Sequence, residues 1–280
     1  MTSDQKLADV ITALESAGVH CLVMGGHAVR YYGLDRTTDD FDLHLAPDCW
    51  DDLTVRISRS DWFRNRNPVE VASWRVASFR RFQIGTLPSG REEWLEFWKE
   101  NHLLPPFEDL FARREVGPYG GRECDFLSLP DLIRSKETER EKDWLDIQYL
   151  EEFHDARVTA SVRSGIAQLG SALAQLRSRR GLETHLLARN LDDSSTVAHA
   201  LSLATNPITV ALLLPAARHA TLPAIPIETA IVNRLRTLGV GSPLHLTLVE
   251  AVRRRYKQDA MQVDKADKQA IRARTDAKGE

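Results

Sequence analysis

The chain has 280 residues, of which 42% are hydrophobic and 28% charged, as expected for one or two globular domains that each bury a core. Its formal net charge is −3, no stretch reaches the ~18 apolar residues of a membrane span, and its start lacks an apolar signal region. The three cysteines are far apart and lack metal-ligand spacing, which excludes a disulfide-rich secreted protein and predicts reduced thiols in a cytoplasmic one.

Charge and aromatic residues divide the chain into two differently composed parts. Residues 1–154 carry a net charge of −10 and residues 155–280 a net charge of +7. All six Trp, all nine Phe and four of the five Tyr lie at or before Phe153. We therefore predict an N-terminal domain over residues 1–153, a helical domain over 158–257 and a charged, flexible tail over 258–280.

The first part mixes helical and extended patterns. Ser3 is placed to cap a helix with apolar residues at helical spacing, which Gly18 would end. The remaining predicted elements follow in chain order: a strand at 19–24, a helix at 27–32, a strand at 41–46, a helix at 47–58, a hairpin of 73–84 and 93–98, a helix at 106–114, an extended run at 124–127 and a long helix at 129–153. Beyond residue 157 the pattern is helical throughout, with helices expected at 162–178, 194–204, 208–217, 225–238 and 243–255.

The most informative stretch is a Gly-Gly turn followed, about fifteen residues later, by two acidic residues. Gly25 and Gly26 end an apolar strand and open a helix, a position where backbone N–H groups can approach phosphates. Asp40 and Asp42 are spaced i and i+2, so in a strand they share one face. Two adjacent carboxylates repel each other unless a cation lies between them, and hard divalent ions prefer oxygen ligands. The stretch therefore predicts phosphoryl or nucleotidyl transfer.

These residues resemble the nucleotidyltransferase superfamily, and within it the minimal nucleotidyltransferases of the AbiEii/MenA toxin type. The matching segments are Gly25-Gly26-His27-Ala28-Val29, then Arg36-x-Thr38-x-Asp40-Phe41-Asp42-Leu43, and then 127–133 followed by Lys136, Arg140, Lys142-Asp143 and Asp146. The resemblance covers roughly residues 1–153. It implies an α+β fold, in which a nucleotidyltransferase-type mixed sheet flanked by helices precedes a mostly α-helical C-terminal domain.

The resemblance also implies a third carboxylate on a later strand, and Glu96 in Trp94-Leu95-Glu96-Phe97-Trp98 is the best match. The family more usually has Asp there. Glu is one methylene longer, so the alternatives are a slightly shifted metal or a structural Glu96, and Glu93 is a competing candidate. The candidate catalytic and metal-binding residues are thus Asp40, Asp42 and Glu96.

The later helix offers candidate nucleotide-binding residues. Lys136, Arg140 and Asp143 are spaced i, i+4 and i+7, which places them on one helix face. A solvated ion-pair face is the ordinary explanation; the resemblance implies that Lys136 reaches the triphosphate. With Gly25, Gly26, Arg36 and Thr38, these residues form the predicted nucleotide site. His27 fits a helix start better than a catalytic role.

The leading hypothesis is an Mg²⁺- or Mn²⁺-dependent enzyme that transfers a nucleoside monophosphate from an NTP to an acceptor hydroxyl. An RNA 3′ end such as that of tRNA is the favoured acceptor, because the C-terminal half is basic and contains Arg253, Arg254 and Arg255. A protein or small-molecule acceptor is the alternative. The resemblance further implies a toxin with a cognate antitoxin protein. The competing hypothesis is a catalytically silent nucleotide-binding or interaction module on the same fold.

Overall fold

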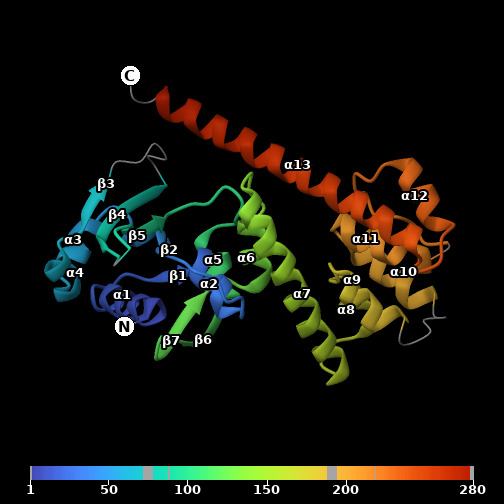
Figure 1. Ribbon diagram of the computed structural model, residues 1–280, viewed down its shortest axis with the longest axis horizontal. Helices are drawn as coiled ribbons and strands as arrows, with labels where there is room; N and C mark the ends of the chain where they lie inside the picture. The colour runs from blue at the N-terminus through green and yellow to red at the C-terminus, as the bar shows by residue number, and fades with distance from the viewer. Residues whose placement is uncertain (1, 72–77, 88, 188–193, 218, 278–280) are drawn as a thin grey trace. The chain divides into compact units, whose positions relative to one another are not determined.

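The computed structural model describes residues 2–71, 78–87, 89–187, 194–217 and 219–277. They form two compact units, one of Met1–Asp146 with Val263–Glu280 and one of Ile147–Gln262. The predicted α+β arrangement is confirmed, because a mixed sheet flanked by helices is followed by a mostly helical part (Figure 1). Among the described residues, no helix has both the length and the apolar character needed to cross a membrane.

The sheet of the first unit has seven strands in the order β3-β4-β5-β2-β1-β7-β6. The strands are β1 (Cys21–Val23), β2 (Asp40–Leu45), β3 (Val69–Val71), β4 (Phe79–Thr86), β5 (Glu92–Trp98), β6 (Glu115–Tyr119) and β7 (Arg122–Phe126). The pairs β2–β5 and β1–β7 are parallel, and the other neighbours are antiparallel. Residues 72–77 lie outside the described part, so the predicted hairpin is seen from β4 onward.

Alternation along the central strands decides which side chains enter the core. Phe41, Leu43 and Leu45 of β2, with Leu95 and Phe97 of β5, are buried to at least 99%. Their burial on one face leaves the residues between them on the other face, where the candidate carboxylates lie. The apolar pattern of these two strands therefore positions the acidic residues.

Helices and turns surround the sheet, and Figure 1 shows α1, α3 and α4 lying close together beside it. The helical elements of this unit are α1 (Ser3–Ser16), α2 (Gly25–Tyr31), the 3₁₀ turn η1 (Pro47–Cys49), α3 (Leu53–Ser58), α4 (Asp61–Arg66), α5 (Phe107–Ala112), α6 (Leu129–Ser135) and the start of α7 (Glu141–Arg163). The cap of α1 is Thr2 and not the predicted Ser3. Thr2 and Gln5 form a reciprocal capping box, which satisfies two of the free N–H groups at the helix start.

The second unit is built from helices around an aliphatic core. Its elements are the rest of α7, α8 (Leu169–Leu173), α9 (Arg179–Leu182), the π-helical turn η2 (Glu183–Leu187), α10 (Ser194–Leu203), α11 (Pro207–Leu213), the 3₁₀ turn η3 (Leu214–Ala216), α12 (Thr229–Arg236) and most of α13 (Pro243–Asp276). The core includes Leu173, Leu182, Leu201 and Leu212, all fully buried. Because every Trp of the chain precedes this unit, aliphatic packing dominates its interior.

Two helices differ from the sequence expectation. The helix expected over 129–153 is interrupted, since α6 ends at Ser135 and α7 begins at Glu141. The tail expected to be flexible over 258–280 is helical as far as Asp276, as part of the 34-residue α13. Sparse apolar residues suggested fraying, but the end of α13 is held by polar contacts with residues far away in sequence, described below.

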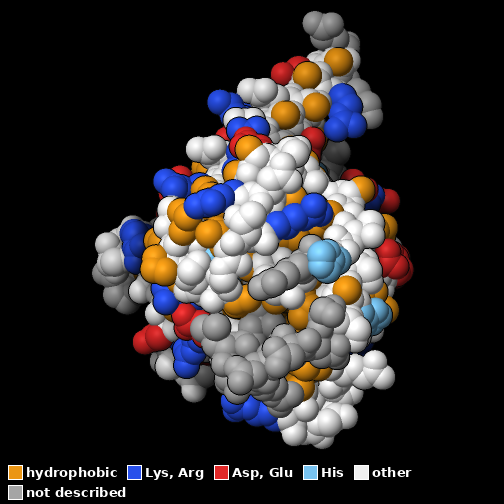
Figure 2. Space-filling view, turned by 90° about the vertical axis from the view of Figure 1, so that its right-hand side faces the viewer, with side chains coloured by type: hydrophobic (Ala, Val, Ile, Leu, Met, Phe, Trp, Pro, Cys, Tyr) orange, Lys and Arg blue, Asp and Glu red, His pale blue; other side chains and the backbone are white. Residues whose placement is uncertain are grey.

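An ion-pair cluster in the second unit uses one of the arginines expected to bind RNA. Glu151 is 1% exposed; its Oε1 lies 2.7 Å from Arg177 Nε and its Oε2 lies 2.6 Å from Arg253 Nη1. Arg253 is thus engaged within its own unit. On the face drawn in Figure 2, the Lys and Arg side chains outside the grey region are scattered among hydrophobic and uncharged ones. Neither observation favours a concentrated phosphate-binding surface.

We expect the substitution Glu151→Gln to destabilise the second unit by roughly 3 kcal/mol, because it leaves two arginines beside a buried, uncharged amide. All tryptophans lie outside Ile147–Gln262, so Trp fluorescence reports on the first unit and far-UV circular dichroism on both. Urea unfolding should show a lower midpoint by circular dichroism with an unchanged fluorescence midpoint. The exposed neighbour variant Glu152→Gln is the control. An unchanged circular dichroism midpoint for Glu151→Gln would show that this cluster is not structural.

Candidate active site

Three rows of side chains run across β4, β5 and β2 on the face opposite the core. In order along β2, the rows are Gln83, Trp94 and Asp40, then Arg81, Glu96 and Asp42, then Phe79, Trp98 and His44. Residues in register on neighbouring strands point to the same face, and successive rows lie ~7 Å apart because two extended residues separate them. The structure therefore brings Asp40, Asp42 and Glu96 to one face, with Glu96 directly opposite Asp42.

The middle row concentrates negative charge beside a single arginine. Glu96 Oε1 lies 3.0 Å from Arg81 Nε. Burial, followed by the charge of Asp42 and a hydrogen bond with it, raises the pKa of Glu96 to about 8, although Arg81 opposes this shift. Burial and the charge of Asp42 likewise raise the pKa of Asp40. The row contains two carboxylates and one guanidinium, so when both acids are ionised its carboxylates outnumber its positive charges.

Glu93, the competing third carboxylate, lies away from this face. It is three residues from Glu96, an odd spacing that directs the two side chains to opposite sides of β5. Its Oε1 accepts a hydrogen bond from Lys6 Nζ at 2.7 Å. The structure therefore favours Glu96 as the carboxylate that joins Asp40 and Asp42.

The Gly-Gly turn lies against the acidic strand. Gly25 has φ of +61°, and a Cβ added to it would lie 1.9 Å from Asp42 Oδ2. A Cβ on Gly26 would lie 2.3 Å from Thr38 Oγ1. Only glycine fits at Gly25, for both its backbone conformation and this close approach. The predicted Gly25, Gly26 and Thr38 thus come together with Asp42.

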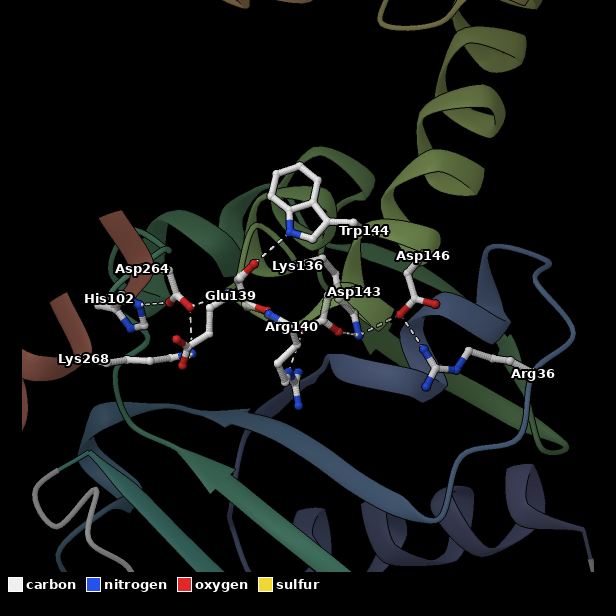
Figure 3. A network of polar contacts seen from close by, with 11 residues as sticks. Arg36, His102, Lys136, Glu139, Arg140, Asp143, Trp144, Asp146, Asp264 and Lys268 are labelled. Atoms are coloured by element: carbon white, nitrogen blue, oxygen red, sulfur yellow. Dashed lines mark hydrogen bonds and ion pairs between the residues drawn. The ribbon is translucent and has the colours of Figure 1, made fainter. Parts of the chain in front are cut away.

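The predicted Lys136, Arg140 and Asp143 also meet, but across the break between α6 and α7 instead of along one helix face (Figure 3). Lys136 Nζ lies 3.4 Å from Asp143 Oδ1, and Arg140 Nε lies 2.8 Å from Asp143 Oδ2. The Thr138 hydroxyl donates to Asp143 Oδ2 at 2.5 Å and accepts from the Arg140 N–H at 3.1 Å. Such side-chain bonds to nearby backbone compete with helix continuation, which explains the break.

This network neutralises most of its own charge. Lys136 also lies 3.1 Å from Asp146 Oδ2, and Arg36 forms an ion pair with the same Asp146 carboxylate. Burial alone would raise the pKa of Asp143, but Lys136, Arg140 and the hydroxyl of Thr138 hold it below its ordinary value. Lys136 and Arg140 would therefore have to exchange a carboxylate for a phosphate in order to bind a nucleotide.

The three rows form part of the wall of a cleft of about 1530 Å³ within the first unit. Besides Gly25, Gly26 and the carboxylates, its wall includes several cations, namely Arg36, Arg81, Lys99, Lys136, Arg140, Lys142, Lys268 and Arg274. Lys142 is exposed, and its charge lowers the pKa of Asp40 against the opposing effect of burial. The cleft thus combines an acidic centre with surrounding positive charge, the pattern that a metal ion and a polyphosphate would require.

The last turns of α13 contribute to this cleft. Asp264 is fully buried and accepts hydrogen bonds from the Glu139 N–H at 2.8 Å and from Lys268 Nζ at 2.7 Å; its Oδ1 lies 2.7 Å from His102 Nε2 (Figure 3). Ile271 and Arg274, farther along the helix, line the cleft. No sequence pattern indicated this role, because the mixed charges of the segment resemble those of a disordered tail.

Three cleft residues were missed by the sequence interpretation. Arg81 is paired in register with Glu96, and His44 follows Asp42 at i+2 on the same face of β2, so strand pairing and alternation together would have identified them. Lys142 belongs to the matched motif but had no assigned role. His44 is 1% exposed, and burial lowers its pKa, so its ring is neutral near pH 7.

The side chains of the site decide whether a divalent cation fits there. Asp40 and Asp42 provide oxygen ligands of the type that Mg²⁺ or Mn²⁺ prefers. However, the described part of the chain contains no group of three His, Cys, Asp or Glu side chains positioned to hold one metal ion. The observed arrangement therefore offers a carboxylate pair, and Glu96, whose pKa is raised, would join it only in its ionised form.

Comparisons with known proteins find matches among solved structures only. No family model and no curated protein matches the sequence. Among solved structures, the chain is similar to the lincosamide antibiotic adenylyltransferase LnuA in its lincomycin-bound form, with 14% identity and a TM-score of 0.40 over 55% of this chain and 98% of that one. It is also similar to JHP933 from Helicobacter pylori, with 13% identity and a TM-score of 0.38 over 94% and 96% of the two chains. At these values, function has to be argued from the residues of the chain itself.

His27 lies in the core beside the site and has no access to the cleft. Its Nδ1 lies 2.9 Å from the Tyr119 hydroxyl, and its ring stacks on Phe41 with 5.1 Å between centroids. Burial lowers the pKa of His27 from 6.5 to about 4, against the opposing charges of Asp4 and Asp42. These contacts agree with the structural role expected for His27.

We expect His27 to make the protein less stable in acid. Its folded pKa is below its unfolded pKa, so the unfolded chain takes up a proton first as the pH falls from 6.5 to 4, and up to roughly 3 kcal/mol of stability is lost over that range. Urea unfolding at several pH values should show this loss in the wild type and a smaller loss in His27→Gln. His20→Gln, at an exposed position, should behave as the wild type. Equal pH dependence in His27→Gln and the wild type would contradict the assignment.

Proposed function

We propose that the chain is a metal-dependent nucleotidyltransferase of the AbiEii/MenA-like kind. The observation that carries the proposal is the middle row: Asp42 lies in register with Glu96 and two residues from Asp40, and the Gly25 backbone lies against the Asp42 carboxylate. A site that holds several carboxylates together gains from binding a divalent cation between them.

The proposed reaction joins an acceptor hydroxyl to the α-phosphate of an NTP. A bond forms from the hydroxyl oxygen to the α-phosphorus, the bond from that phosphorus to the β-bridging oxygen breaks, and pyrophosphate leaves. The hydroxyl proton passes to an ionised carboxylate of the middle row; Glu96, whose pKa is raised, can accept it only once it has lost its own proton. Asp40 and Asp42 would hold Mg²⁺ or Mn²⁺, which supplies charge neutralisation to the phosphates.

The residues near Asp40 fit the polyphosphate. Lys142 is exposed at the cleft wall, and Arg36 lies on the same side, preceding β2. Arg36 is paired with Asp146, and Lys136 and Arg140 contact Asp143. We therefore assign the exposed Lys142 the first contact with phosphate, and Arg36, Lys136 and Arg140 a positioning role through Asp146 and Asp143.

The acceptor and the biological role are proposed in addition to the reaction. An RNA 3′ end such as that of tRNA is the acceptor indicated by the basic composition of the C-terminal half, although Arg253 of that half is paired with Glu151; a protein or small molecule is the alternative. All three classes of acceptor are present in a whole-cell extract, so one assay can compare them. A toxin role with a cognate antitoxin rests on the sequence resemblance alone.

A catalytically silent nucleotide-binding module is the second candidate. It is favoured by the absence, within the described residues, of three metal-ligating side chains positioned around one point. Both candidates would bind an NTP, but only the enzyme would transfer its nucleotide to an acceptor. Binding and turnover therefore both have to be measured.

The test is incubation of the purified protein with each α-³²P-labelled NTP and a whole-cell extract, with Mg²⁺, Mn²⁺ or EDTA. Label appearing in RNA, protein or a small molecule only in the presence of metal would support the enzyme and identify its acceptor. Calorimetric binding of NTP with Mg²⁺, without any labelled product, would support the silent module. Neither binding nor labelling would contradict both candidates.

A further inference from the structure

The third row of the cleft face differs in chemistry from the other two. Phe79, Trp98 and His44 are in register across β4, β5 and β2. The Phe79 and Trp98 rings lie 4.6 Å apart, and the Phe107 ring of α5 lies 5.7 Å from the imidazole of His44. The neighbouring wall of the cleft mixes apolar residues with charged and polar ones: Leu103, Leu104, Pro105 and Pro106 lie between Lys99, Glu100, Asn101 and His102 on one side and Glu108 on the other. The rings of the row itself are suited to a flat, largely apolar group.

His44 brings an unusual polar group into this end of the cleft. The residue is 1% exposed and lines the cleft. The backbone of Leu45 lies near enough to oppose the effect of burial on its pKa, but by distance and angle neither ring nitrogen forms a well-made hydrogen bond with a described residue. A buried polar atom without a partner is costly, and most such atoms in folded proteins are satisfied. Neutral imidazole has one donor and one acceptor, so a ligand with complementary groups would satisfy both. The nitrogens are covered, so the ligand would displace a neighbouring ring such as that of Phe107.

The order of the rows indicates which substrate this end receives. Arg36 and Lys142 lie toward Asp40, at the start of β2, and His44 lies two residues beyond Asp42, toward its end. In phosphoryl transfer the attacking and leaving oxygens are roughly in line through the phosphorus. If pyrophosphate leaves toward Arg36 and Lys142, the acceptor hydroxyl comes from the side of His44.

We propose that the row of Phe79, Trp98 and His44 binds the acceptor, and that the acceptor presents a planar heteroaromatic ring of nucleobase size. The inference rests on the nucleotidyltransferase proposal and narrows its substrate class. The ring stacks among the aromatic side chains and exchanges hydrogen bonds with the His44 nitrogens. Since the third row lies ~7 Å from the second, a hydroxyl on a sugar attached to this ring reaches the α-phosphate near Asp42. Base stacking on aromatic side chains is a common means of holding a nucleic-acid end.

The test measures the binding of free nucleosides, which carry the ring without any phosphate. Adenosine, cytidine, guanosine and uridine are titrated into the full-length protein with Mg²⁺, with and without saturating α,β-methylene-ATP, and binding is followed by saturation-transfer NMR. We expect at least one nucleoside to bind equally well with the analogue present, because the two occupy different parts of the cleft.

Variants at His44 then test the contact itself. His44→Phe keeps the ring and removes both nitrogens, so the Kd of that nucleoside should rise roughly five- to tenfold while the Kd of α,β-methylene-ATP stays unchanged. His44→Gln restores a donor and an acceptor and should recover most of the affinity. The exposed-site variant His20→Phe should have no effect, and circular dichroism verifies that each variant is folded.

Three results would overturn the inference: no nucleoside binds, the bound nucleoside is displaced by α,β-methylene-ATP, or His44→Phe leaves nucleoside affinity unchanged. Displacement would assign the row to the base of the NTP. These results differ from failure of the proposed function, in which α,β-methylene-ATP itself does not bind the wild type in the presence of Mg²⁺.

Discussion

Asp42→Asn should lower nucleotidyl transfer by about 10³-fold or more while leaving the protein folded. Asparagine keeps the shape of the side chain but removes the negative charge needed to hold a divalent cation, whose stabilisation of the phosphates amounts to several kcal/mol. The same change removes a repelling charge next to Glu96, so the pKa of Glu96 should fall from about 8 toward its ordinary value of 4.5. Transfer of label from α-³²P-NTP and infrared titration of the carboxyl groups measure the two effects independently.

Asp39→Asn is the matched control for this experiment. Asp39 is one residue before Asp40 and forms an ion pair with Arg91 at 2.5 Å, outside the three rows. Its substitution should leave both transfer and the titration of Glu96 nearly unchanged. If Asp42→Asn retains activity near that of the wild type, Asp42 is not part of a metal site, and the central claim of the proposed function is wrong.

Gly25→Ala should also abolish most of the activity, while it lowers the stability of the fold only modestly. The added Cβ would lie 1.9 Å from Asp42 Oδ2, so the carboxylate must move, and an L-residue at φ of +61° costs a further ~1–2 kcal/mol. Displacement of a reacting group by about 1 Å can cost 10²-fold in rate. We expect a loss of about 10²-fold in kcat/KM, measured with labelled NTP, and a modest fall in the urea midpoint.

Gly121→Ala separates backbone strain from the close approach. Gly121 has φ of +94°, and a Cβ added there would meet no atom within 4 Å. It should lower the urea midpoint by a similar amount and leave kcat/KM unchanged. If the two variants lose activity equally, general strain explains the effect and the contact of Gly25 with Asp42 has no catalytic importance.

The local periodicity of the sequence predicts the site better than it predicts the helices. Alternation along β2 and β5 placed Asp40, Asp42 and Glu96 on one face because their apolar neighbours must be buried on the other. Odd spacing alone could have excluded Glu93. By contrast, the break between α6 and α7 depends on the Thr138 hydroxyl, which accepts from the Arg140 N–H and donates to Asp143, and no periodicity reveals these contacts.

Contacts between distant segments account for the remaining differences. The position of Arg81 opposite Glu96 depends on the pairing of β4 with β5, and the helical state of the last described residues depends on Asp264, which meets His102 and Glu139. The net charge of the C-terminal half predicted a nucleic-acid surface, but Arg253 is paired with Glu151. Composition describes an average over many residues and does not show which charges are already neutralised.

The discontinuity of the first unit has a consequence for how the protein is made. The sheet and its carboxylates are synthesised early, whereas Val263–Glu280, which belongs to the same unit, is translated only after the second unit. A ribosome must therefore make all of Ile147–Gln262 before Lys268, Ile271 and Arg274 can take their places along the cleft. A nascent chain that still lacks this segment has its carboxylate strand but an unfinished cleft, so assembly of the site waits for synthesis of the whole second unit.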